Sequence, residues 1–301
     1  MSGVQALRRA GRGGAALLAT LAGLLHTASF APVEAWWLEI AALAALAFAA
    51  RDATPRRAAL LGWLFGSAWL ASGLWWIFIS LHRFGAMPAP LAALAVALLG
   101  SGLGLYYAAA LALWARWRGP CESRTPVAMA AGFAACWLLA ELARGTLLTG
   151  FPWIAGGYAH TSGPLAAWAP WIGVYGIGAL AAWFAGVLGV AHWRRTRLAG
   201  LAALGPLAAL LVGLLLPHEF TRDTGRLLVS LLQPNVAQDL KFDGGHIEEG
   251  LRWHMQTLAR ARGTLVLAPE SSIPLPLAEL GSTLVQALRV PFAVGDRAAL
   301  V

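Results

Sequence analysis

The stretch Thr264–Pro274, TLVLAPESSIP, places a single carboxylate directly after a short apolar run. Leu265–Ala268 predicts a buried strand, and Pro269 ends that strand one residue before Glu270. Open α/β sheets form their clefts at the carboxyl ends of strands, where a carboxylate can act as a general base. The second proline, Pro274, would stiffen the loop. Glu270 is therefore a candidate general base, although an ordinary loop glutamate gives the same local pattern.

A second group of candidate residues lies at the end of an apolar segment. Glu141 and Arg144 are three positions apart, which places them on one face of a helix. They either pair with each other or hold a lipid headgroup. The next loop contains Thr149–Trp153, TGFPW, and is too rich in glycine and aromatic residues for a plain connector. Its aromatic residues Phe151 and Trp153 are candidate contacts for lipid.

The composition is that of an integral membrane protein. The 301 residues are 59% hydrophobic and only 12% charged, which is too apolar for a soluble protein of this length. The net charge of +8 comes from arginines in short clusters between apolar runs, a pattern typical of membrane loops and not of nucleic-acid binding. Seven apolar segments, of which the second and fifth are short, are candidate membrane spans: Gly13–Phe30, Ala35–Ala50, Ala58–Leu81, Pro88–Ala115, Val127–Leu142, Leu165–Trp193 and Leu198–Leu216.

The positions of the basic residues predict an orientation. Twelve arginines fall on one side of the membrane if the seven segments alternate: Arg8, Arg9, Arg12, Arg51, Arg56, Arg57, Arg116, Arg118, Arg124, Arg194, Arg195 and Arg197. The opposite loops carry only Arg83 and Arg144. The positive-inside rule then places the N-terminus in the cytoplasm and everything after Pro217 outside. The 15 tryptophans, many of them near span ends, form an interfacial belt or line a lipid cleft on the outer face.

After Arg226 the pattern changes to alternating strands and helices. The expected elements are a strand at Leu227–Leu232, a helix at Asp243–Arg262, a strand at Leu265–Ala268, a helix at Leu277–Leu288 and a strand at Val290–Val294. This order predicts a parallel sheet. We therefore expect a membrane domain of about seven helices at residues 1–217 and an incomplete periplasmic α/β domain at residues 226–301. Because the sheet would keep an unpaired edge and the sequence stops in a hydrophobic run, a truncated product is expected.

No metal site or cofactor is predicted. The two cysteines, Cys121 and Cys136, have no metal-ligand spacing and no nearby histidine that would activate a thiol. We interpret both as small apolar residues.

Taken together, several stretches resemble bacterial apolipoprotein N-acyltransferases, inner-membrane enzymes with a nitrilase-like (carbon–nitrogen hydrolase) domain on the periplasmic side. The fold that this resemblance implies is a multi-span α-helical membrane bundle followed by a nitrilase-like α/β domain, which is partial here. The resemblance covers nearly the whole chain and rests on these motifs: SFAP (Ser29–Pro32), Gly62–Ser80, ELARGTLLTGFPW (Glu141–Trp153), GVYG (Gly173–Gly176), SLLQPNVAQDLKF (Ser230–Phe242) and APESSIP (Ala268–Pro274).

The resemblance implies an acyl transfer that uses a glutamate, a lysine and a cysteine. The cysteine takes an acyl chain from a phospholipid as a thioester, and the N-terminal diacylglyceryl-cysteine of a lipoprotein then accepts it. Glu270 matches the glutamate of the PES motif. Lys241 precedes it and matches a lysine–aromatic pair, in which Phe242 replaces the usual tryptophan and would keep a hydrophobic wall for lipid without an indole N–H. Neither lysine nor cysteine occurs after Glu270.

The expected family is therefore an N-acyltransferase, and the 301-residue chain as given is expected to be inactive. Its partners would be the membrane, a phospholipid acyl donor and a diacylglyceryl-lipoprotein acceptor, with no nucleic acid. The alternative is a non-catalytic membrane protein that only binds lipid or a partner. A membrane-anchored amidase is disfavoured, because an anchor needs only one helix.

Overall fold

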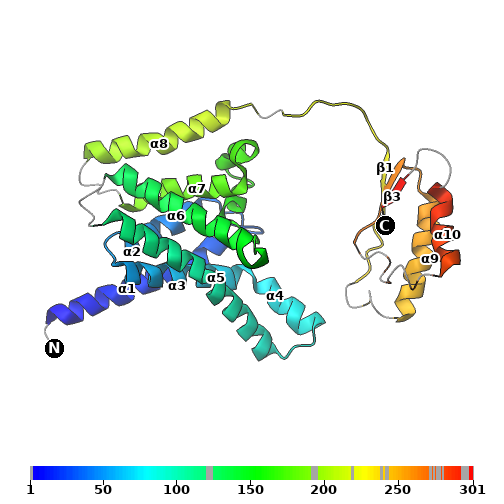
Figure 1. Ribbon diagram of the computed structural model, residues 1–301, viewed down its shortest axis with the longest axis horizontal. Coiled ribbons are helices and arrows are strands. Elements are labelled where there is room, and N and C mark those ends of the chain that lie inside the picture. The colour runs from blue at the N-terminus through cyan, green and yellow to red at the C-terminus, as the bar shows by residue number, and fades with distance from the viewer. Residues whose placement is uncertain are drawn as a thin grey trace. The chain divides into compact units, whose positions relative to one another are not determined.

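The computed structural model describes residues 3–119, 125–190, 196–217, 220–237, 240, 244–270, 273, 275, 279, 281–292 and 298–300. The chain divides into two compact units, Met1–His218 and Glu219–Val301. The two units are distinguished by secondary structure, since helices form the first and a small sheet with helices forms the second (Figure 1).

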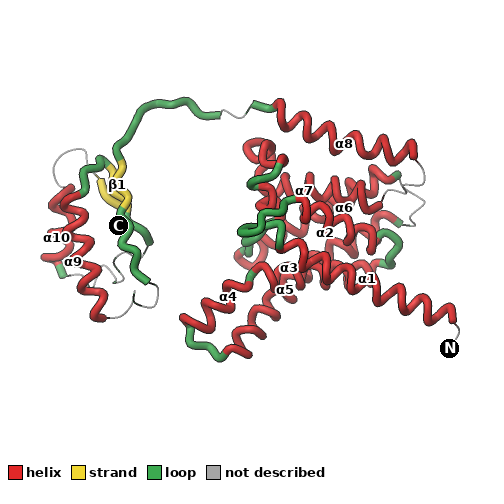
Figure 2. Tube along the Cα trace, turned by 180° about the vertical axis from the view of Figure 1, so that it is seen from behind, coloured by secondary structure: helices red, strands yellow, loops and turns green. Residues whose placement is uncertain are grey.

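Helices and short turns build the first unit (Figure 2). Its elements are α1 (Gly3–Thr27), α2 (Trp37–Ala50), α3 (Pro55–Gly73), α4 (Trp75–Ile79), a π-helical turn (Ser80–Phe84), α5 (Ala89–Arg118), α6 (Pro126–Thr146), three 3-10 turns (Leu147–Thr149, Gly156–His160 and Pro164–Trp168), α7 (Ala169–Val190) and α8 (Thr196–Leu215). Each of the seven predicted apolar segments overlaps one or more of these helices.

Three helical segments among the described residues are long and apolar enough to cross a membrane: Ala89–Arg118, Pro126–Thr149 and Pro164–Val190. The helices Pro55–Gly73 and Trp75–Phe84, which meet at a bend of 51°, make a fourth if they form one span. The fifth predicted span was expected to be short, but Pro126–Thr149 has 24 residues because the helix continues through the polar Glu141–Arg144 turn into a 3-10 turn. These segments support a helical membrane bundle, and the number of seven crossings stays a prediction.

Helices α3 and α5 make the most extensive contact in this unit. Four glycines line the seam between them: Gly62 and Gly66 on α3, and Gly100 and Gly104 on α5. A Cβ atom on Gly62 would collide with the carbonyl oxygen of Tyr107, and one on Gly100 would lie 2.8 Å from the amide nitrogen of Ala71. Small residues at four-residue spacing allow such a close approach of two helix backbones.

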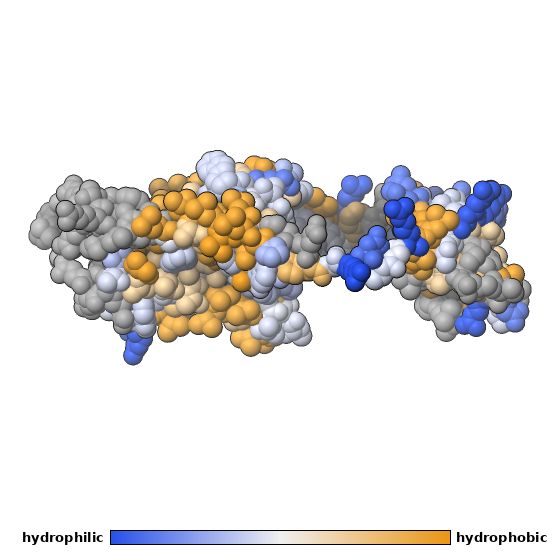
Figure 3. Space-filling view, turned by 90° about the horizontal axis from the view of Figure 1, so that it is seen from above, coloured by the Kyte–Doolittle hydropathy of each residue, from blue (hydrophilic) through white to orange (hydrophobic). Residues whose placement is uncertain are grey.

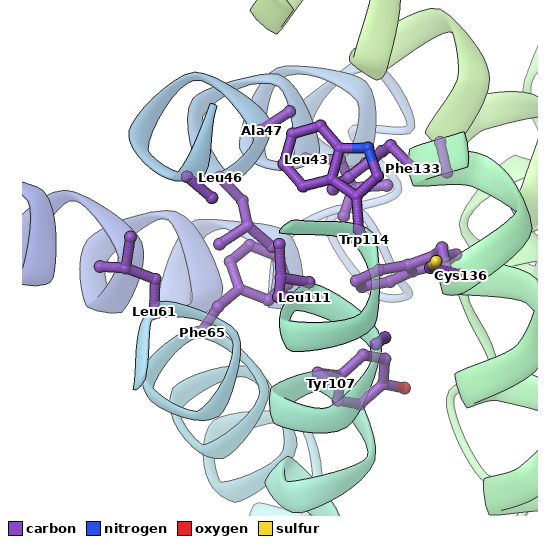
Figure 4. Packing of buried hydrophobic residues seen from close by; sticks show 14 of the residues in the cluster. Leu43, Leu46, Ala47, Leu61, Phe65, Tyr107, Leu111, Trp114, Phe133 and Cys136 are labelled. Carbon is purple, nitrogen blue, oxygen red and sulfur yellow. The ribbon is translucent and has the colours of Figure 1, made fainter. Parts of the chain in front are cut away.

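The buried core lies between α2, α3, α5 and α6. Figure 4 shows Leu46, Phe65, Leu111 and Phe133 converging from these four helices, with Tyr107 beside them. All five side chains are almost completely buried. By contrast, hydrophobic residues cover much of the described outer surface of the unit (Figure 3). An apolar surface around an apolar core is the pattern expected of helices surrounded by lipid.

The second unit contains a small parallel sheet in the order β1-β2-β3. Its elements are β1 (Val229–Leu231), α9 (Gly244–Arg260), β2 (Leu265–Leu267), α10 (Ser282–Arg289), a 3-10 turn (Val290–Phe292) and β3 (Ala298–Leu300). Val229 pairs with Leu265, which in turn pairs with Ala298. The predicted parallel arrangement is confirmed, whereas a three-stranded sheet does not by itself identify a nitrilase-like domain.

The third predicted strand was misplaced. Val290–Phe292 continues from α10 as a 3-10 turn, and β3 begins at Ala298 instead. Pro291 explains the difference, since a proline fits a helical turn but cannot donate a hydrogen bond to a sheet. The second helix also begins later than predicted, at Ser282.

Candidate functional site

Glu141 and Arg144 form a buried pair near the end of α6. Nη2 of Arg144 lies 3.2 Å from Oε2 of Glu141, and both side chains are almost fully buried. The hydroxyl group of Tyr107 donates a hydrogen bond to Oε1 of the same carboxylate. Of the two alternatives that the sequence left open, the structure describes the direct pair. A buried carboxylate that accepts several hydrogen bonds is stabilised against the cost of leaving water.

The guanidinium group of Arg144 also holds the loop that follows α6. Its Nη1 atom donates to the carbonyl oxygens of Phe151 and Trp153, each at 2.7 Å. The backbone nitrogen of Phe151 donates in return to the carbonyl oxygen of Arg144, again at 2.7 Å. This planar group therefore links the end of a membrane helix to both aromatic positions of the TGFPW motif, which a single lysine amine could not do in the same geometry.

The loop is folded back on itself through unusual backbone angles. Leu148, Thr149 and Ile154 have φ values of 54°, 72° and 49°, in the left-handed region. Gly150 has a φ of 80°, and a Cβ atom there would strike the carbonyl oxygen of Gly145. Such angles are costly for residues other than glycine, so the surrounding hydrogen bonds must hold the loop in place. The Arg144 contacts supply that restraint.

A second buried group of polar residues was missed in the sequence. Glu39 from α2 lies between His160, whose Nε2 atom is 2.8 Å from its Oε2, and His26 from α1, whose Nε2 is 3.9 Å from its Oε1. All three side chains have 0% exposure. The signal was present, because a glutamate near the start of an apolar helix and a histidine inside another are rare in membrane spans and usually have a function.

Gly156 joins the two buried groups. Its backbone nitrogen donates to Oε2 of Glu141 at 3.0 Å, and a Cβ atom at this position would lie 2.7 Å from Oε1 of Glu39. Only glycine allows the loop to pass this close to a carboxylate on each side. The tetrad of Glu141, Arg144, Glu39 and His160 therefore fixes residues 151–160 from both ends, and we call it the loop clamp.

The outer edge of the loop presents aromatic side chains. Trp153 is 58% exposed and meets Trp76 edge to face, with ring centroids 5.6 Å apart. Trp76 itself is 42% exposed. Phe151, by contrast, packs partly buried against the core. The loop clamp thus orients one aromatic residue inward and one outward.

The remaining candidates belong to the second unit. Glu270 lies in an exposed turn three residues after the last residue of β2, Leu267. This is the carboxyl end of the central strand, as the sequence predicts. Phe242 and Lys241 lie outside the described residues. Among the residues that are described, no group of His, Cys, Asp and Glu has the arrangement of a metal site.

Comparison with known proteins extends this description. A family model described as the apolipoprotein N-acyltransferase N-terminal domain matches residues 22–187, which include every residue of the loop clamp. The chain belongs to the apolipoprotein N-acyltransferase family. The resemblance inferred from the TGFPW and PES motifs is confirmed at this level.

Individual members of the apolipoprotein N-acyltransferase family match most of the chain. The protein of that name from Verminephrobacter eiseniae is 46% identical, over 94% of this chain and 56% of the relative. The one from Ralstonia nicotianae is 44% identical, over 91% of this chain and 53% of the relative. The one from Pseudomonas putida is 37% identical, over 86% and 52% respectively. The chain therefore spans about half the length of the curated relatives that it matches.

Proposed function

We propose that this chain forms the membrane domain and the beginning of the catalytic domain of an apolipoprotein N-acyltransferase in the bacterial inner membrane. The observation that supports this most strongly is the loop clamp, which lies inside the family-matched region and rigidly holds an aromatic loop at one end of an apolar bundle. The proposed topology has a cytoplasmic N-terminus and places residues 226–301, as a partial nitrilase-like domain, in the periplasm.

In this proposal the loop receives the phospholipid acyl donor. Trp153 contacts lipid directly, since it is exposed beside Trp76. Glu141 and Arg144 act on the lipid through the loop that they position, because both guanidinium Nη atoms bond to the protein itself. Phe151 supports the loop from its buried side. Phe242 is a separate candidate contact for lipid in the second unit.

Glu270 is the proposed general base. It would take the proton of a cysteine thiol as the sulfur attacks the phospholipid ester, giving a thioester and a lysophospholipid. The α-amino group of a diacylglyceryl-cysteine would then attack the thioester, forming an amide and releasing the thiol. A lysine would stabilise the oxyanion in both steps. Because residues 271–301 contain neither lysine nor cysteine, the 301-residue chain alone is not expected to complete either step.

A chimera tests the proposed function. Residues 1–270 of this chain would be joined to the segment of the Verminephrobacter eiseniae relative that follows the matching glutamate. Reconstituted with phospholipid labelled in its acyl chain and a diacylglyceryl-cysteine peptide, the chimera should acylate the peptide. Glu270→Gln should abolish transfer, while Glu249→Gln, which changes an exposed carboxylate on α9 of the same chimera, should leave transfer unchanged.

Two outcomes would contradict the proposal. The first is a chimera that inserts and folds but transfers no label, which would favour a membrane protein that only binds lipid. The second is turnover or a stable thioester with the 301-residue chain alone, which would show that the nucleophile has been misassigned.

A further inference from the structure

Three adjoining hollows surround the connection between α2 and α3. They have volumes of about 420, 350 and 400 Å³, and Asp52 lines all three. Together they extend from α1, at Gly11 and Leu18, past the end of α2 and the start of α3, at Arg51 and Arg57, to the end of α5, at Arg116 and Gly119. We call this surface the arginine groove.

The arginine groove lies at the other end of α2 from the loop clamp. Trp36, just before α2, is in ring contact with His160 at 5.9 Å, whereas Arg51 immediately follows the last residue of α2. The helix between them has 14 residues, which corresponds to about 21 Å at 1.5 Å per residue. The groove is therefore a separate feature and contributes no residue to the proposed acyl-donor site.

The backbone around the groove is held by its own arginines. Arg118 is buried and donates to the carbonyl oxygens of Ala50 at 3.3 Å and Ala53 at 2.5 Å. Nη2 of Arg57 donates to the carbonyl oxygen of Gly11 at 3.3 Å, which ties the start of α3 to α1. These contacts fix the loop between α2 and α3, so the groove is a formed surface and not only a run of basic residues.

The side chains in the groove combine positive charge with apolar contact area. Arg51 lies over the ring of Phe48, with its Cζ atom 4.3 Å from the ring centroid, and its Nε atom donates to Asp52 at 3.2 Å. Leu18 and Phe48 are 37% and 51% exposed next to this pair. Five arginines line the hollows against one aspartate: Arg51, Arg56, Arg57, Arg116 and Arg118. Of these five, Arg118 is buried.

We propose that the arginine groove binds the phosphate headgroup of an anionic phospholipid from the leaflet at this end of the bundle. The arginines contact the phosphate, and the acyl chains lie along the apolar stripe of Leu18, Phe48 and Leu60. Basic pockets between membrane helices have the chemistry that recognises anionic headgroups. The proposal rests on the membrane insertion proposed above but not on acyl transfer, because the groove is remote from the loop clamp.

Lipid binding in nanodiscs tests the proposal. The 301-residue chain would be placed in discs containing a trace of fluorescent phosphatidylglycerol in phosphatidylcholine, and energy transfer from its tryptophans would report occupancy. Both leaflets of a disc have the same composition, so an altered orientation does not change the result. Arg51→Gln and Arg57→Gln should each weaken phosphatidylglycerol binding about fivefold. Asp52→Asn should strengthen it by a similar factor, because it removes the one acidic side chain in the groove.

Control variants distinguish binding in the groove from a general electrostatic attraction of anionic lipid to the protein. Arg83→Gln, at the opposite end of the bundle, should change affinity less than twofold, and melting temperatures should show that all variants are folded. Equal binding of phosphatidylcholine, or unchanged affinity in both groove variants, would overturn the proposal. Displacement of the lipid by millimolar inorganic phosphate would also overturn it, since the groove would then select a free anion. None of these results would affect the chimera assay of the proposed function.

Discussion

Arg144 in the loop clamp and the groove arginines Arg51 and Arg57 lie at the two ends of the helical unit and differ in their surroundings. Arg144 is buried, pairs with Glu141 and donates to two backbone carbonyl groups of one loop. Arg51 and Arg57 lie at the other end on a grooved surface and are partly exposed, with Arg51 paired to Asp52 and Arg57 bonded to one backbone carbonyl group. Burial determines the difference, because a charge removed from water must be fully paired whereas an exposed one need not be. The first kind of arginine builds structure, and the second remains available to ligands.

The largest loss of stability should come from replacing Arg144 in the loop clamp. In Arg144→Met, the carboxylate of Glu141 loses its partner and the loop loses two hydrogen bonds, so the free energy of unfolding should fall by about 3–5 kcal/mol. Unfolding in mixed micelles, followed by tryptophan fluorescence, measures this. Arg144→Lys is the matched control: it keeps the charge but not the planar fork, and should recover only part of the loss. A loss below 1 kcal/mol in Arg144→Met would show that the pair does not hold the loop.

A glycine at the centre of the loop clamp provides the next test. Gly156→Ala places a Cβ atom 2.7 Å from Oε1 of Glu39 and should destabilise the unit by about 1–3 kcal/mol. Gly102→Ala on α5 is the control, because no atom lies within 4 Å of its Cβ position. Helix propensity predicts that this control is stabilising by about 0.5–1 kcal/mol. If both variants behaved alike, the close approach at Gly156 would have no energetic importance.

The sequence predicted more of the arginine groove than of the loop clamp. Arginine clusters between apolar runs are a local pattern, so the exposed end could be located from spacing alone. The pairing of Glu141 with Arg144 was one of two open alternatives, because their helical spacing is also local. The contact of Glu39 with His160 joins positions 121 residues apart in the chain, as the difference of their numbers shows. A contact between positions so far apart leaves no periodic pattern in the sequence. The glutamate within an apolar helix nevertheless indicated a residue with a function.

In the second unit, local composition predicted two of the strands but misplaced the third. The apolar runs that became β1 and β2 were found to within two residues, since short apolar runs rich in valine and leucine have a clear composition. Val290–Val294 has a similar composition, yet its first three residues form a turn because Pro291, two residues after the end of α10, cannot donate a hydrogen bond to a sheet. Hydrophobicity locates an apolar segment, whereas the hydrogen bonds available to its backbone determine whether it pairs in a sheet.

The smallest loss of stability should come from replacing Arg57 in the arginine groove. Arg57→Gln removes a bond of 3.3 Å to Gly11 on a partly exposed side chain, and the free energy of unfolding should change by less than about 1 kcal/mol. The same variant is expected to bind phosphatidylglycerol about fivefold more weakly, whereas Arg144→Met should lose stability and keep that binding while it is folded. A large loss of stability in Arg57→Gln, measured by the same micelle unfolding, would mean that Arg57 has a mainly structural role, as Arg144 does, and that the contrast between them is wrong.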